Sequence, residues 1–108
     1  MSDRELRVPG EQPGTFRVVA ESARVERGWH ELVARRTNDD AKRAYRRLSD
    51  SPLERYPGRQ FPLRGKLFAG VWEYEVGPGD RIFYVGDEER SCVYVGYAGP
   101  HAHPGDVL

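Results

Sequence analysis

The sequence of 108 residues has one cysteine, no net charge and no long apolar run, and each scarcity excludes a class of protein. Cys92 has no partner for an internal disulfide and no second cysteine for a zinc knuckle, so we expect it to be a small buried hydrophobe. No apolar stretch approaches the length that crosses a bilayer, and the first residues lack the apolar segment of a secretory signal. We therefore expect a cytoplasmic protein with no membrane association, no metal and no cofactor.

Charge is unevenly distributed along the chain. Residues 22–49 hold eight Lys or Arg against four Asp or Glu, and residues 52–67 hold four against one. Residues 73–90 reverse this balance, with two basic and six acidic side chains. The distribution predicts a dipolar surface, although ordinary solvation of exposed faces explains it equally well. A net charge of zero gives no reason to expect whole-molecule attraction to nucleic acid.

The length suits one domain with one core. Two Pro-Gly pairs and many charged side chains in residues 1–14 predict a flexible N-terminal tail. We expect the domain to span residues 15–101 and an irregular C-terminal tail to span residues 102–108.

The first half of the chain predicts two helices. Between Ser22 and about Arg36, apolar residues recur at spacings of three and four, on one helical face. Ser22 is a candidate N-cap, because its hydroxyl can accept a hydrogen bond from a free amide of the first turn. Gly28 weakens the prediction, since glycine costs about 1 kcal/mol relative to alanine inside a helix. The face consists of Val25, Trp29, Leu32 and Val33.

A second helix is predicted to follow a cap at Thr37. Asp39 and Asp40 suit the positive end of its dipole, and Pro52 disfavours helical geometry at Ser51 and so ends it. Its buried stripe is expected to be Ala41, Ala44, Tyr45 and Leu48.

Four strands are predicted by β-forming residues and alternation: 15–20, 71–76, 81–85 and 91–97. Apolar residues on both faces of 15–20 suggest an interior strand. Residues 53–70 have no periodicity and should lie irregularly, pinned across the domain by their apolar side chains. We therefore expect an α+β fold of order β-α-α-β-β-β, in which two N-terminal helices pack on one face of a small, mostly antiparallel four-stranded sheet.

Residues 15–101 resemble the RelE/ParE superfamily of toxins from bacterial type II toxin–antitoxin modules. The resemblance rests on the order of elements, on Pro62-Leu-Arg-Gly-Lys66 before the hairpin, on Val71-Trp72, and on the strand Asp80-Arg-Ile-Phe-Tyr84. In the mRNA-cleaving branches it implies a compact, metal-independent endoribonuclease that enters the ribosomal A site and inhibits translation. It also implies three partners: a cognate antitoxin, the ribosome and mRNA.

Metal-free RNA cleavage needs a base for the 2′-hydroxyl, a cation for the phosphate and an acid for the leaving oxygen. Arg81 matches the strand arginine of the family, and it could grip two phosphate oxygens at once. An ion pair with Glu73 or Glu75 across the hairpin is the alternative. Which of these roles Arg81 fills is left open by the sequence.

The resemblance assigns RNA binding to Arg64 and Lys66, the two basic residues that precede the predicted hairpin, and we add Arg59. The alternative is that these are solvated charges in a loop. His101 and His103 lie near the position where several of these toxins carry an acid or base, and imidazole titrates in the useful range. Inert tail histidines are the alternative. A metal site at this pair is rejected, because no cysteine or further histidine offers a third ligand.

Two departures from the family pattern bear on activity. Phe61 stands where some ribonuclease branches place a glutamate before Pro-Leu, and no arginine or tyrosine follows Tyr97. A gyrase-inhibiting toxin of the ParE branch and a non-catalytic protein-binding homologue are therefore the alternatives to a ribonuclease.

Overall fold

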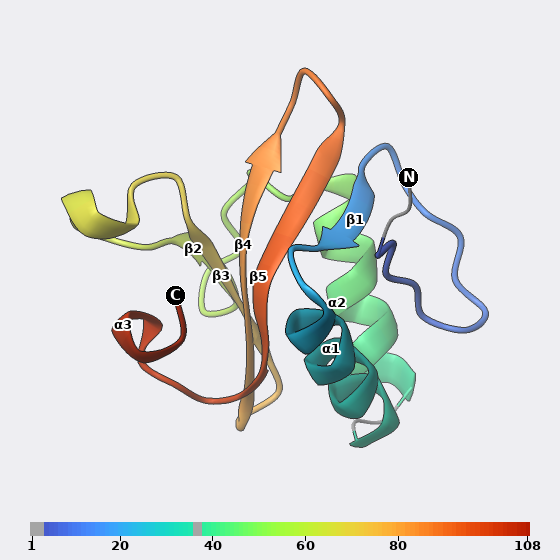
Figure 1. The fold of residues 1–108 in the computed structure, drawn as a ribbon. Helices are drawn as coiled ribbons and strands as arrows, with labels where there is room; N and C mark the ends of the chain where they lie inside the picture. Colours follow the sequence, from blue (N-terminus) through green and yellow to red (C-terminus); the bar gives the residue numbers. More distant parts are fainter. Residues whose placement is uncertain (1–3, 36–37) are drawn as a thin grey trace.

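The structure is a computed structural model that describes residues 4–35 and 38–108. Two helices cover one face of a five-stranded sheet, in the strand order β1-β5-β4-β3-β2 (Figure 1). The first strand runs parallel to the last, and the other neighbours are antiparallel. The predicted fold class is thus confirmed, with one strand more than expected. The strands are β1 (Arg17–Ala20), β2 (Gln60–Pro62), β3 (Trp72–Val76), β4 (Asp80–Asp87) and β5 (Cys92–Pro100).

β2 is the strand that the sequence did not predict. It pairs with β3, with Gln60 opposite Tyr74 and Pro62 opposite Trp72. Three residues that end in proline are too few to show an alternation, and proline is tolerated because β2 lies at the sheet edge. A short 3-10 helix, η1 (Lys66–Phe68), follows in a loop that protrudes from the body (Figure 1).

Gln60 anchors the segment that precedes β2. Its side chain is fully buried, and its amide donates to the carbonyl oxygens of Ser51 and Pro52 at 3.0 and 3.2 Å. It also donates to the hydroxyl of Tyr84 at 2.7 Å, and that hydroxyl donates to the Pro52 carbonyl at 2.6 Å. The expectation of a pinned segment is therefore confirmed around Gln60, where a buried polar network holds it, and is wrong for the loop of η1, where Leu67 is 84% exposed.

The two helices are α1 (Ala23–Arg35) and α2 (Asn38–Asp50), close to the predicted bounds. The hydroxyl of Ser22 accepts a hydrogen bond from the Val25 amide at 3.2 Å, so the predicted cap is confirmed. The second predicted cap, Thr37, lies outside the described residues. The predicted stripes face the sheet: Val25, Trp29, Leu32, Ala41, Ala44, Tyr45 and Leu48 are all buried, and Val33 packs against them.

Gly28 is explained by the packing of α1 on β5. A Cβ atom at this position would lie 2.3 Å from the carbonyl oxygen of Ala98, closer than any real contact. Glycine therefore permits the close approach of helix and strand, and its poor helix propensity is outweighed by tertiary contact.

The N-terminal segment differs from the tail that the sequence predicted. The Leu6 amide donates to the Val18 carbonyl at 2.8 Å, and the Ala20 amide donates to the Arg4 carbonyl at 2.9 Å. Leu6 and Val8 are buried in the core. Residues 4–8 thus cover β1, which lies at the edge of the five-stranded sheet and not in its interior as expected.

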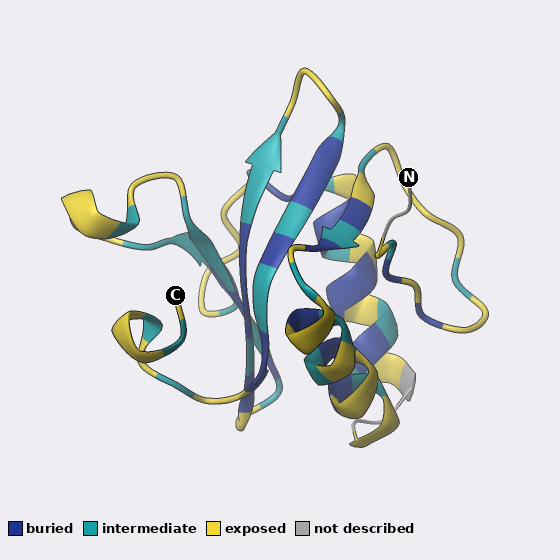
Figure 2. Ribbon diagram, viewed as in Figure 1, coloured by how far each residue is buried: buried dark blue, intermediate teal, exposed yellow. Residues whose placement is uncertain are grey.

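The C-terminal residues also carry more structure than predicted. β5 continues to Pro100, and a helical turn, α3 (Pro104–Val107), follows. The segment crosses the sheet on the side away from α1 and α2 (Figure 1). Burial is concentrated between the helices and the sheet (Figure 2), so the core lies on that side. Over the described ranges, no helix has both the length and the apolar character to cross a membrane.

Candidate functional site

The sheet face turned away from α1 and α2, which we call the outer face, carries Arg81 and the glutamates that the sequence offered as its partners. Opposite residues of paired strands point to the same face. Glu75 is opposite Arg81, and Glu73 lies between Phe61 and Phe83. The alternation predicted for both strands is therefore confirmed.

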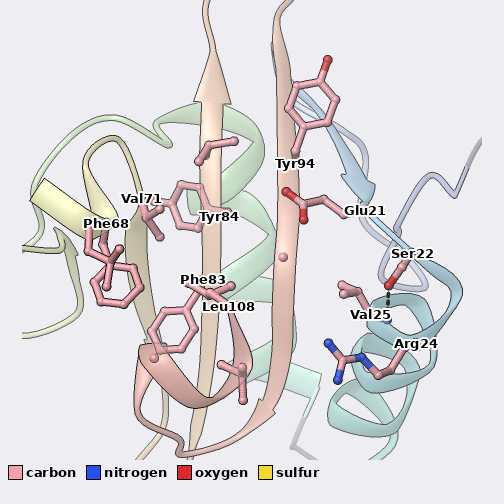
Figure 3. A pocket seen from close by; sticks show the side chains of 15 residues that line it. Glu21, Ser22, Arg24, Val25, Phe68, Val71, Phe83, Tyr84, Tyr94 and Leu108 are labelled. Carbon is pink, nitrogen blue, oxygen red and sulfur yellow. Dashed lines mark hydrogen bonds between the residues drawn. The ribbon is translucent and has the colours of Figure 1, made fainter.

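A groove of about 650 Å³ lies beside this face. Phe68 lines it from η1, Phe83 from β4 and Leu108 from the C-terminal end (Figure 3). Glu21, between β1 and α1, and Arg24, in the first turn of α1, line the opposite side (Figure 3). The groove thus combines aromatic side chains with charges of both signs, a composition suited to a base and phosphate or to a peptide segment.

Arg81 is held between two glutamates. Its Nε lies 3.1 Å from Glu73 Oε2, and its Nη2 lies 3.9 Å from Glu75 Oε2. Nη1 donates to the carbonyl oxygens of Asp80 and Gly77 at 2.9 and 3.4 Å. Only 11% of the Arg81 side chain is exposed. The ion pair that the sequence offered as an alternative is therefore present, and a phosphate-binding role stays a prediction.

The ion pair with Glu73 is not aligned as a hydrogen bond. Arg81 Nε is buried and makes no hydrogen bond within the described residues, despite its short distance from the carboxylate. The contact is therefore an ion pair between a buried guanidinium nitrogen and a carboxylate oxygen 3.1 Å away.

Glu73 is a site residue that the sequence analysis treated only as a counter-charge. Burial raises the pKa of its carboxyl above the ordinary value of 4.5, and the negative charge of Glu75 adds to this. Arg81 and His101 lower the pKa through their charges, but burial outweighs them. A carboxyl that holds its proton more readily than usual, beside a guanidinium and an imidazole, is the kind of group that takes part in proton transfer.

The two predicted histidines occupy different environments. His101 follows β5, its amide donates to the Gly79 carbonyl at 2.8 Å, and its exposed side chain influences Glu73. His103 Nδ1 accepts a hydrogen bond from the Gly105 amide at 3.3 Å and so caps α3. The structure therefore places His101 where its charge acts on Glu73 and gives His103 a local structural contact.

The predicted RNA-binding residues also separate into two groups. Arg64 and Lys66 are exposed on the protruding loop, and neither makes an ion pair or side-chain hydrogen bond with another described residue. Leu67, beside Lys66, is 84% exposed and lines the groove. Arg59 instead donates from Nη1 to the Glu75 carbonyl at 3.2 Å. The loop pair is thus free to bind a ligand, whereas Arg59 has a structural contact.

Residues 4–35 and 38–108 contain no group of three His, Cys, Asp or Glu side chains that could hold a metal ion. Cys92 is buried with a free thiol, as expected for a small hydrophobe in a strand.

The fold is similar to that of a chain in the crystal structure of the toxin-antitoxin complex RelBE2 from Mycobacterium tuberculosis. The TM-score is 0.56 at 23% identity, and the match covers 83% of this chain and 100% of that chain. Neither a protein-family model nor a curated protein matches the sequence. The likeness shows a RelE-like fold, in agreement with the element order and the sheet topology.

Proposed function

We propose that this protein is the toxin of a type II toxin–antitoxin pair and cleaves ribosome-bound mRNA without a metal ion, thereby inhibiting translation. The observation that carries the proposal is the gathering of Arg81, Glu73 and His101 on the outer face of a RelE-like fold, beside an open aromatic groove. These are the chemical types that metal-free RNA cleavage requires.

Each predicted site residue takes a role in this proposal. Arg81 stabilises the charge that develops on the scissile phosphate, and His101 exchanges a proton with a reacting oxygen. His103 is the second candidate for proton exchange, should its contact in α3 be released. The exposed loop residues Arg64 and Lys66 hold the RNA backbone, and Arg59 is the third RNA-binding residue of the proposal.

Arg81 must turn from its glutamates to reach a phosphate. The guanidinium is permanently charged, and a phosphate offers it the same bidentate geometry as a carboxylate. Exchange of one anionic partner for another therefore needs no change in the protonation of Arg81.

The antitoxin is proposed as the partner that restrains this activity. The similar chain was crystallised in a toxin-antitoxin complex. Here Leu67 and Leu108, which are 84% and 50% exposed, line the groove and offer apolar surface on which a peptide segment could pack.

Expression in bacteria tests the proposal. Induction of the wild-type chain is expected to stop growth and to produce codon-associated cuts in translated mRNA, detected by mapping RNA ends. Arg81→Ala should abolish both effects while thermal unfolding shows an intact fold. Arg90→Ala, at a side chain that is 77% exposed, is the matched control and should remain toxic. Equal toxicity of Arg81→Ala would overturn the role of Arg81, and growth arrest without cuts would overturn the ribonuclease.

One observation favours a second candidate function, a non-catalytic homologue or a gyrase inhibitor that acts by binding protein. Arg81 is engaged by two carboxylates and little exposed, as expected for a structural ion pair. DNA damage on induction, with no mRNA cuts, would support the gyrase inhibitor.

A further inference from the structure

Glu73 occupies a more protected place than the other acidic residue that pairs with Arg81. Its side chain is 14% exposed, against 31% for Glu75. It lies in register between Phe61 on β2 and Phe83 on β4, and Phe83 is a lining residue of the groove. The carboxylate therefore stands between two aromatic side chains, next to the place where an RNA base could stack.

We propose that Glu73 is the general base of the RNA cleavage proposed above, on which this inference rests, and that its ion pair with Arg81 is the resting state of the catalytic pair. Arg81 binds the scissile phosphate when RNA enters, and the phosphate replaces Glu73 as its partner. Glu73 is then an unpaired carboxylate within reach of the nucleotide that Arg81 holds.

The proposed step conserves atoms and charge. Glu73 takes the proton of the 2′-hydroxyl, and the 2′-oxygen forms a bond to phosphorus. The bond from phosphorus to the 5′-oxygen breaks, and protonated His101 gives its proton to that oxygen. The products are a 2′,3′-cyclic phosphate and a 5′-hydroxyl, with Glu73 protonated and His101 neutral. Solvent then returns both groups to their starting states.

Burial and neighbouring charges set the basicity of Glu73. The charged groups that act on it are Arg81 on β4, Glu75 on β3 and His101 in the C-terminal segment, whereas its neighbour on β2, Phe61, is uncharged. Burial and Glu75 raise the pKa of Glu73 above 4.5. A raised pKa makes the carboxylate a stronger base than an ordinary glutamate.

Single-turnover cleavage of mRNA on programmed ribosomes, measured across pH, tests the inference. The wild-type rate should fall as pH decreases through an acid limb that lies above the ordinary range of glutamate. Glu73→Gln should lower the rate by about 100- to 10,000-fold and remove that limb. Glu73→Asp should keep the limb at a reduced rate, and it also serves if the glutamine variant does not fold.

Glu75→Gln is the matched control, because Glu75 contacts the same guanidinium from the same strand. Its rate should stay within about fivefold of wild type, the range of an exposed ion pair. Its acid limb should move to lower pH, because Glu75 raises the pKa of Glu73 and the variant removes this effect.

The outcomes separate the two proposals. An active wild type with an equally active Glu73→Gln variant would overturn the role of Glu73 alone. A reduced rate that keeps the wild-type acid limb would also overturn it, since Glu73 would then only position Arg81. A wild type that leaves ribosome-bound mRNA intact would overturn the ribonuclease and the base together.

Discussion

Replacing Gly28 with alanine should destabilise the protein, although alanine is the better helix former. The new Cβ would lie 2.3 Å from the Ala98 carbonyl oxygen, and ordinary contact begins at 3.4 Å. The obstructing atom belongs to the backbone of β5 and cannot rotate away, so α1 or β5 must shift. The shift would disturb Val25 and Trp29, which α1 buries against the sheet.

The expected magnitude follows from two opposed effects. Overpacking of a well-filled interior costs about 1 to 3 kcal/mol, and a clash between backbone and a fixed methyl belongs near the upper end. Alanine recovers about 1 kcal/mol of helix propensity relative to glycine. The free energy of unfolding should therefore fall by about 2 kcal/mol, which lowers the melting temperature by roughly 8 °C in a domain of this size.

Thermal unfolding followed by circular dichroism measures this effect. Arg27→Ala, one position earlier on α1 at an exposed side chain, is the matched control and should leave the melting temperature nearly unchanged. A Gly28→Ala variant that melts at the wild-type temperature or above would refute the reasoning, because helix propensity would then outweigh the contact between α1 and β5.

Three further outcomes are expected. Tyr84→Phe removes a hydroxyl that bonds Gln60 and Pro52, so urea unfolding should show a loss of about 1 to 3 kcal/mol; an unchanged midpoint would contradict this network. Leu6→Ala should cost about 2 to 5 kcal/mol in the same assay, whereas Leu67→Ala, at a residue 84% exposed, should cost little; equal effects would place residues 4–8 outside the core. Burial raises the pKa of Tyr84 above 10.0, so stability should be complete below that pH and decrease as pH rises above it, less steeply in Tyr84→Phe.

The helices and the central hairpin could be predicted because their signals are local. Spacings of three and four fix a helical face, and alternation in residues 71–76 fixes a strand face, whatever the rest of the chain does. β2 could not be predicted in this way, because its three residues are held by pairing with β3 and by the buried Gln60 network. Residues 4–8 were mistaken for a tail for the same reason. Their Leu6 and Val8 are too few to signal a strand until β1 is present to pair with them.

The candidate site shows the same division between local and distant signals. Arg81 and the glutamates were found on one face because alternation places them there. Some ribonuclease branches of the family place a glutamate at the position of Phe61, and the sequence alone could not show which carboxylate lies next to that position, because pairing between strands cannot be deduced from a linear pattern. The register shows that Glu73 is the direct neighbour of Phe61, so a carboxylate is present one strand away from the expected position. His101 and His103 were equivalent in sequence, and they are separated by the capping contact of His103 in α3 and by the influence of His101 on Glu73.

The two candidate functions make opposite demands on the ion pair of Arg81. A structural pair has to persist when the partner protein binds, so removal of Glu73 would lower stability and leave the remaining surface unchanged. A catalytic pair has to open, because the phosphate and the carboxylate compete for one guanidinium. Arg81 Nε lies 3.1 Å from Glu73 Oε2, so the closed pair already gives this donor an anionic neighbour. Loss of stability without loss of cleavage in Glu73→Gln would therefore identify a structural pair. Loss of cleavage with unchanged stability would identify the pair that opens.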